Sequence, residues 1–150
     1  MNPEDPFDLD RFVQAQAGTY AQALDELHAG RKRTHWMWFV FPQLAGLGHS
    51  AMSRRYGLSG LDEARAYLAH PVLGERLRQC CTAVLASGVS AHTLLGSPDD
   101  LKLRSCMTLF AHAAPPGQAG PFVAVLERCF GGEVDPVTRA RLAAGHDAAR

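Results

Sequence analysis

Apolar residues recur along the chain at spacings of three and four, and glycine and proline divide this pattern into short stretches. Such a period is typical of helices that bury one face, whereas the strands of a half-buried sheet alternate apolar and polar residues. The chain has no convincing β-branched alternation. The pattern predicts helices over about residues 8–18, 20–30, 35–41, 59–68, 71–85, 97–114, 122–130 and 135–142, and another after Ser50.

Helix-start signals frame several of these stretches. Asp8 is expected to cap the first helix, and Ser59 begins a capping-box sequence. Pro71 suits the first position of the helix that it begins. The strongest start signal is Ser97–Asp100, which combines a cap serine, a proline and two carboxylates. Asp135–Pro136 begins the last helix in a similar way.

The segment Trp36–Phe41 is apolar at either period, so its spacing does not separate helix from strand. A strand here would be buried on both faces and would need neighbouring strands, which the rest of the chain does not supply. We therefore expect a central apolar helix over 35–41, capped by Thr34 and ended near Pro42. A small sheet is the alternative.

These elements predict an all-α fold, a compact bundle of about seven to nine short helices that forms one domain over residues 1–150. A length of 150 residues suits one hydrophobic core, and 47% hydrophobic with 20% charged residues is ordinary for a globular protein. We expect the ordered core to span about residues 5–142 and the alanine-rich tail after Leu142 to be flexible.

Charge and cysteine content narrow the classes of partner and compartment. Fifteen basic residues balance fifteen acidic ones, which does not favour binding to nucleic acid or to an anionic membrane. The N-terminus is acidic and has no apolar secretory segment, and the longest apolar run, Trp36–Phe41, is far shorter than the roughly 20 residues of a bilayer span. The four cysteines include no Cys-x-x-Cys pair, which favours buried free thiols in a reducing cytoplasm.

Lys32 and His35 lie beside two indoles, those of Trp36 and Trp38. On a helix, a cation and an imidazole three residues apart share a face. Aromatic faces next to a cation and a proton carrier suit a planar anionic ligand such as a nucleotide. The alternative is that both tryptophans are core residues, that His35 is hydrogen-bonded within the core and that Lys32 is solvated.

The loop from Gln43 to Ser50 contains two glycines and leads into another predicted helix. Backbone N–H groups around Gly48, with Ser50 near the helix start, are suited to cradling an anion. An ordinary turn is the alternative. No Walker or Gly-x-Gly-x-x-Gly pattern accompanies the loop, so no cofactor is expected.

A third cluster lies at the predicted helix start near residue 99. Asp99, Lys102 and Ser105 follow one another at intervals of three, and Lys102 is one of only two lysines beside thirteen arginines. A lysine in this setting points to a compact charge or a deprotonatable amine, and helix capping is the alternative. No metal site is expected, because the seven histidines include no His-x-x-x-His or Glu-x-x-His pair.

Five segments carry a resemblance to a known family. They are Asp8–Gln16, Gly30–Gln43, Gly46–Ser50, Tyr67–Pro71 and Asp99–Phe110, and the His-Trp-Met-Trp-Phe block within them is highly specific. The pattern looks like the bacterial domain-of-unknown-function family 1810, some members of which carry the label calpastatin, over residues 5–142. This resemblance implies a compact helical domain and no established activity. We set the calpastatin label aside, because an inhibitor of a calcium protease is expected to be an extended chain.

The family pattern usually has a second serine after Ser105, and this chain has Cys106 there. That departure weakens any role for a serine pair.

A second resemblance concerns Asp10. The segment Asp10–Gln16 is similar in layout to the Glu-His-x-Phe-Gln-Ala motif of NADAR-type helical enzymes, which act on N-glycosidic bonds of ADP-ribose-like molecules, and Asp99–Phe130 has a comparable rhythm. The resemblance implies that Asp10 stands where those proteins place a catalytic glutamate. Its side chain is one methylene shorter and Arg11 replaces the following histidine, which puts the role in doubt. An ordinary first-turn carboxylate is the alternative.

Two hypotheses follow. The first is an intracellular protein that binds a small phosphate-bearing, nucleotide-like or ADP-ribose-like ligand and, if it is an enzyme, hydrolyses its glycosidic bond. Its catalytic candidates are Asp10 and His35, and its ligand-binding candidates are Lys32, Trp36, Trp38, Gln43, Gly48, Ser50, Asp99, Lys102 and Ser105. The second is a non-catalytic protein-interaction module that exposes Trp36–Phe41 as an apolar patch.

Overall fold

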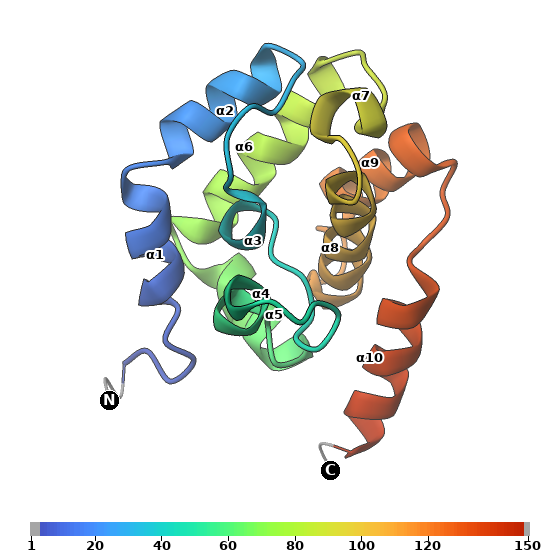
Figure 1. Cartoon of the computed structure of the whole chain (residues 1–150). Helices are drawn as coiled ribbons and strands as arrows, with labels where there is room; N and C mark the ends of the chain where they lie inside the picture. The colour runs from blue at the N-terminus through green and yellow to red at the C-terminus, as the bar shows by residue number, and fades with distance from the viewer. Residues whose placement is uncertain (1–3, 149–150) are drawn as a thin grey trace.

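The computed structural model of the chain describes residues 4–148, and this part contains ten α-helices and no β-strand (Figure 1). The helices are α1 (Asp10–Ala17), α2 (Tyr20–His28), α3 (Met37–Val40), α4 (Ala51–Tyr56), α5 (Leu61–Ala69), α6 (Leu73–Ala86), α7 (Ala91–Leu95), α8 (Asp99–Ala113), α9 (Gly120–Phe130) and α10 (Pro136–Ala148). An isolated parallel bridge joins Leu44 to Leu58. The all-α prediction is confirmed, and the alternative of a small sheet is wrong for the described residues.

The longest helix, α8, organises the packing, because it contacts α5, α7, α9 and α10. Its buried side chains lie on most of its faces and include Leu103, Cys106, Leu109 and Phe110. A helix that is buried nearly all round is an interior helix. In Figure 1, α1 and α2 lie on one side of the molecule and α10 forms the opposite edge. No helix in the described part is long and apolar enough to cross a membrane.

The apolar block at 35–41 forms the predicted helix, but α3 covers only Met37–Val40. Trp36 and Phe41, on either side of it, are 0% and 1% exposed. Thr34 does not cap α3, because its N–H and its hydroxyl both donate to the carboxylate of Glu26. The expected cap is therefore wrong. The residue directly before α3 is the buried Trp36, which makes no side-chain cap hydrogen bond to the helix.

Several predicted boundaries are confirmed near the C-terminus. Asp135 Oδ2 accepts the N–H of Thr138 and caps α10. Helix α9 ends before Gly131, whose φ of 62° is left-handed, and the N–H of the next residue, Gly132, donates to Leu126 O. Helix α10 continues to Ala148, and the flexibility expected after residue 142 stays a prediction. Residues 149–150 of that tail lie outside the described part of the chain.

Other predicted caps are wrong because a different side chain reaches the free N–H groups. Asp8 has a φ of 52° and does not cap α1. Asp5 accepts the N–H groups of Leu9 and Asp10 instead. Both predicted and actual caps are aspartates, so composition alone does not distinguish them.

The next two caps also differ from the prediction. No side chain of the N-cap residue Gly60 caps α5, and Glu63, in the first turn of that helix, accepts the N–H of Ser59. Helix α8 begins at Asp99, and Ser97 makes no capping hydrogen bond to it. The start of each helix was predicted within two residues, but the side-chain cap expected there is absent from both.

Helix α6 begins at Leu73 rather than at Pro71, because His70 Nδ1 accepts the N–H of Leu73. The short helix α7 was not predicted. Its start is marked by Ser90, whose side chain accepts the N–H of Thr93, a signal that the sequence does contain.

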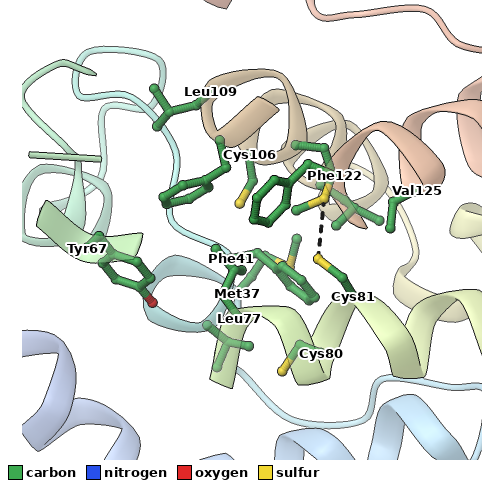
Figure 2. Packing of buried hydrophobic residues seen from close by; sticks show 14 of the residues in the cluster. Met37, Phe41, Tyr67, Leu77, Cys80, Cys81, Cys106, Leu109, Phe122 and Val125 are labelled. Carbon is green, nitrogen blue, oxygen red and sulfur yellow. Dashed lines mark hydrogen bonds between the residues drawn. The ribbon is translucent and has the colours of Figure 1, made fainter. Parts of the chain in front are cut away.

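Sulfur atoms fill part of the core between α6 and α8. In Figure 2, Cys81 and Cys106 point into the space where Phe122 also lies, and Cys81 Sγ is 3.7 Å from the sulfur of Met107. Burial raises the pKa of Cys80 to about 12 and raises the pKa of Cys81 and Cys106 as well. The prediction of buried free thiols is therefore confirmed for these three, and buried thiols of raised pKa are poor nucleophiles.

A single glycine lets α6 pack closely against the end of α5. A Cβ at Gly74 would lie 2.1 Å from the backbone oxygen of Leu68. We predict that Gly74→Ala lowers the free energy of unfolding by about 2–3 kcal/mol, although alanine is the better helix former. Urea unfolding followed by circular dichroism measures this change.

The matched control is Gly120→Ala, at the start of α9, where a Cβ meets nothing within 4 Å. It is expected to change the stability by less than about 1 kcal/mol. Equal stability of Gly74→Ala and the unchanged protein would contradict the close approach.

Candidate functional site

One buried carboxylate holds the loop that precedes α3. Glu26, on α2, accepts hydrogen bonds from Arg33 N–H at 2.7 Å, Thr34 N–H at 3.0 Å, the Thr34 hydroxyl at 2.6 Å and Trp36 Nε1 at 3.0 Å. The residue is only 7% exposed. These bonds fix a non-helical path for residues 31–36 and turn the indole of Trp36 into the core.

The same hydrogen bonds keep Glu26 ionised. Burial alone would raise the pKa of its carboxyl, but the donors on Thr34, Arg33 and Trp36 outweigh burial and lower the pKa from 4.5 to about 2. Glu26 is therefore a fixed structural anion near neutral pH and not a proton carrier.

Lys32 lies within this loop and is nearly buried. Its N–H donates to Leu94 O at 2.6 Å, which ties the loop to α7. Its Nζ lies 3.0 Å from Asp99 Oδ2 and 5.3 Å from the centre of the Trp36 ring. Because the side chain is only 9% exposed, the interpretation of Lys32 as a solvated cation is wrong.

Lys102 repeats the arrangement from α8. Its Nζ lies 3.6 Å from Asp99 Oδ1 and 5.8 Å from the centre of the Trp38 ring. Asp99 therefore bridges two ammonium groups, each of which faces an indole. We name Lys32, Trp36, Trp38, Asp99 and Lys102 the lysine–tryptophan cluster. With both lysines protonated, the cluster carries one positive charge more than its carboxylate neutralises.

A small cavity lies beside the cluster. Its lining residues are Met37, Trp38, Phe41, Gln43, Ser53, Tyr56, Gly57 and Lys102, and we name it the Trp38 cavity. The volume open to the centre of a water molecule is about 10 Å³, which is room for about one water. The cavity accepts one small polar group and is too small for a nucleoside.

Of the predicted loop from Gln43 to Ser50, Gln43 lines this cavity, while Gly48 and Ser50 lie next to the lining residue Ser53. Ser50 caps α4 by accepting Ser53 N–H at 3.1 Å, and its hydroxyl donates to Ser53 Oγ at 2.9 Å. A Cβ at Gly48 would lie 2.5 Å from Ser53 Oγ and 3.8 Å from Gln43 Nε2. The structure therefore brings these four residues together, and Gly48 is required by the close approach of Ser53.

Asp10 lies elsewhere. It is exposed at the start of α1 and lines a separate cavity formed by residues 4–10 with Ala66, Ala69 and His70. Arg11, at the position of the NADAR histidine, is 12% exposed and pairs with Glu63 Oε2 at 2.9 Å. Neither residue lines the Trp38 cavity.

His35 and Ser105 also lie outside that cavity. His35 is exposed, and it shares no helix face with Lys32, because residues 31–36 are not helical. Ser105 is buried, and its hydroxyl donates to Leu101 O within α8 at 3.2 Å. Among the described residues, no group of three His, Cys, Asp or Glu side chains is placed to hold a metal ion.

Sequence reasoning missed Glu26, Ser53 and Tyr56. Glu26 follows the exposed Asp25 in α2, and its four donors lie seven to ten residues further along the chain. No local pattern marks it. Ser53 carries a local signal, because a serine three residues after the cap of a short helix faces that cap.

Glu26→Gln is predicted to lower the free energy of unfolding by about 2–3 kcal/mol near pH 7. The NH2 group of the glutamine side chain would face N–H and O–H groups that now donate to the carboxylate, and those groups would lose their acceptor. The folded pKa of about 2 lies below the unfolded value of 4.5, so the stabilisation is fully present above about pH 4.5 and is lost as pH falls through 2. Urea unfolding at about pH 7 and about pH 3 should therefore show a smaller difference between the two proteins at the lower pH.

Asp25→Asn is the matched control, because Asp25 is the exposed neighbour on the same helix. It should leave the stability nearly unchanged at both pH values. A loss for Glu26→Gln that is the same at both pH values would show that the charge of Glu26 is not what stabilises the loop.

Comparison with known proteins places the chain in a family. The family described as "Protein of unknown function (DUF1810)" matches residues 6–142. A solved structure, that of the conserved hypothetical protein Rv1873 from Mycobacterium tuberculosis, is 55% identical, with a TM-score of 0.89 over 93% of this chain and 99% of that one. No curated protein matches the chain. The chain therefore belongs to the DUF1810 family, as its sequence resemblance predicted.

Proposed function

We propose that the protein binds a small phosphate-bearing ligand, such as a nucleotide or ADP-ribose, at the mouth of the Trp38 cavity. The observation that carries the proposal is the bridge of Asp99 between Lys32 and Lys102, with each ammonium facing an indole. A structural salt bridge needs one lysine. The second lysine, Lys102, has a side chain that is 27% exposed, so its ammonium group is accessible to an anion.

The two lysines have different parts in this proposal. Lys32 is the more buried and the closer to Asp99, so it keeps the carboxylate in place. Lys102 is more exposed and 3.6 Å from the same carboxylate, so a phosphate oxygen can replace Asp99 as its partner. Charge-assisted hydrogen bonds to a phosphate are stronger than neutral ones and favour this exchange.

The half-buried Trp38 supplies the aromatic face. A base or ribose would lie against the exposed part of this indole, while Gln43 and Ser53 face the one polar group that enters the cavity. The small volume of the cavity means that most of the ligand lies on the surface. We therefore propose a ligand of modest affinity and not an enclosed cofactor.

Binding is a better-supported part of the first hypothesis than hydrolysis. Asp10 lines another cavity and His35 is exposed away from this one, so neither supports a catalytic role here. The carboxylate that does lie in the lysine–tryptophan cluster is that of Asp99, and it is paired with both lysines. The alternative of an interaction module required an exposed block at 36–41, and that block is buried apart from Trp38.

We also propose that this is a bacterial, cytoplasmic protein. The similar structure comes from a mycobacterium, and all four cysteines are free. Free thiols are typical of a reducing compartment. The net charge of zero supports a small-molecule ligand over nucleic acid or an anionic membrane.

Titration with ADP-ribose should quench tryptophan fluorescence and raise the melting temperature, because the ligand contacts Trp38 and binds only the folded protein. Lys102→Gln should weaken binding by about tenfold through loss of the charge-assisted contact. Trp38→Phe should abolish the fluorescence change, since Trp36 is fully buried. Adenosine and inorganic phosphate, titrated separately, measure the contributions of the two halves of the ligand.

Arg54→Gln is the matched control, because it removes one exposed positive charge on α4 outside the lining of the cavity. It should bind ADP-ribose as the unchanged protein does. The proposal is wrong if ADP-ribose gives no saturable change, or if Lys102→Gln and Arg54→Gln bind it equally well.

A further inference from the structure

A second recess lies between α8 and α10, outside the lysine–tryptophan cluster. Val134, Pro136, Ala140 and Ala143 form its apolar wall, and Arg104 and Arg139 add two guanidinium groups. Its volume is about 700 Å³, and it is open to solvent over much of its extent, so it is a surface groove and not an enclosed pocket. We name it the α8–α10 groove. The helix that closes it, α10, forms the edge of the molecule in Figure 1.

Arg104 is incompletely paired. Its Nη2 lies 3.6 Å from Asp135 Oδ1, which is an ion pair longer than a hydrogen bond. Its Nε is buried and has no hydrogen-bond partner among the described residues. A buried donor without an acceptor costs free energy, so this guanidinium favours an additional acceptor.

The remaining acceptors nearby do not fill that need. Asp135 Oδ2 already accepts from the N–H and the hydroxyl of Thr138, where it caps α10. Glu133 lines the groove but lies on its exposed rim. Arg139 is exposed on α10 and lines the groove, and no ion pair within 4 Å joins it to another described residue.

We propose that the α8–α10 groove binds a monocarboxylate that carries a short apolar chain. The Arg104 side chain is 24% exposed while its Nε is buried, so a carboxylate in the groove accepts from the Nη groups of this guanidinium. Arg139 adds a second positive charge at the same end. The alanines, Val134 and Pro136 take the chain, because they offer an apolar surface without polar groups that would have to be desolvated.

Isothermal titration calorimetry of the full chain with octanoate, 1-octanol and inorganic phosphate tests this proposal. Octanoate should bind saturably and at least tenfold more tightly than either of the other two, because it alone has both the anion and the apolar chain. Ala140→Phe should abolish binding by filling the groove from an exposed position. Arg139→Gln should weaken it severalfold, and Glu133→Gln should tighten it severalfold.

Arg141→Gln is the matched control, because Arg141 is an exposed arginine of the same helix outside the groove. It should bind octanoate as the unchanged protein does. The proposal is overturned if octanoate shows no saturable binding, if octanol binds as well as octanoate, or if Ala140→Phe binds equally well. Circular dichroism of each variant confirms that the fold is retained, and none of these outcomes bears on ADP-ribose binding at the Trp38 cavity.

Discussion

The carboxylate of Glu26 determines the arrangement of the candidate site. A charge that is removed from water is costly unless donors surround it, and here four donors from residues 33–36 do so. Those donors are spread over a loop that has no regular structure of its own. The hydrogen bonds therefore give the loop one path, which carries Lys32 to Asp99 and Trp36 into the core.

Helix α8 connects this loop to the rest of the molecule. Its first residue, Asp99, pairs with Lys32, while Lys102 one turn later pairs with the same carboxylate. Further along, Arg104 faces the α8–α10 groove and Phe110 packs in the core. Because α8 is an interior helix, all these side chains start from a backbone that is held on most sides. Asp99 and Lys102 of the lysine–tryptophan cluster therefore lie on a rigid helix, and the loop 31–36 contacts that helix through Lys32.

The sequence predicted helices well because apolar spacing and glycine or proline punctuation are local properties. It predicted Asp135 as a cap, but it chose Asp8 where Asp5 acts, since either carboxylate can reach a free N–H. At the site, grouping Lys102 with Asp99 followed from helical spacing. Grouping Lys32 with Asp99 did not, because these residues lie far apart in the sequence and their contact depends on Glu26. The face shared with His35 was wrong for the same reason: a buried carboxylate overrides helix formation at 31–36.

The walls of the Trp38 cavity explain why its ligand must lie at the mouth. On one side the backbone of residues 43–45 is bonded to Leu58, through Ala45 N–H to Leu58 O at 2.7 Å and Leu58 N–H to Gln43 O at 3.0 Å. A Cβ at Gly57 would lie 2.7 Å from Ala45 Cα, so the two segments are already in contact. Widening the cavity on this side would break backbone hydrogen bonds, each of which is costly when its groups are buried. The side chains free to adapt are those that are half-buried, namely Trp38 and Lys102 together with Gln43 and Ser53. Selectivity at this site therefore depends on the charge and the aromatic face presented at the surface, because the backbone limits the depth available to any ligand.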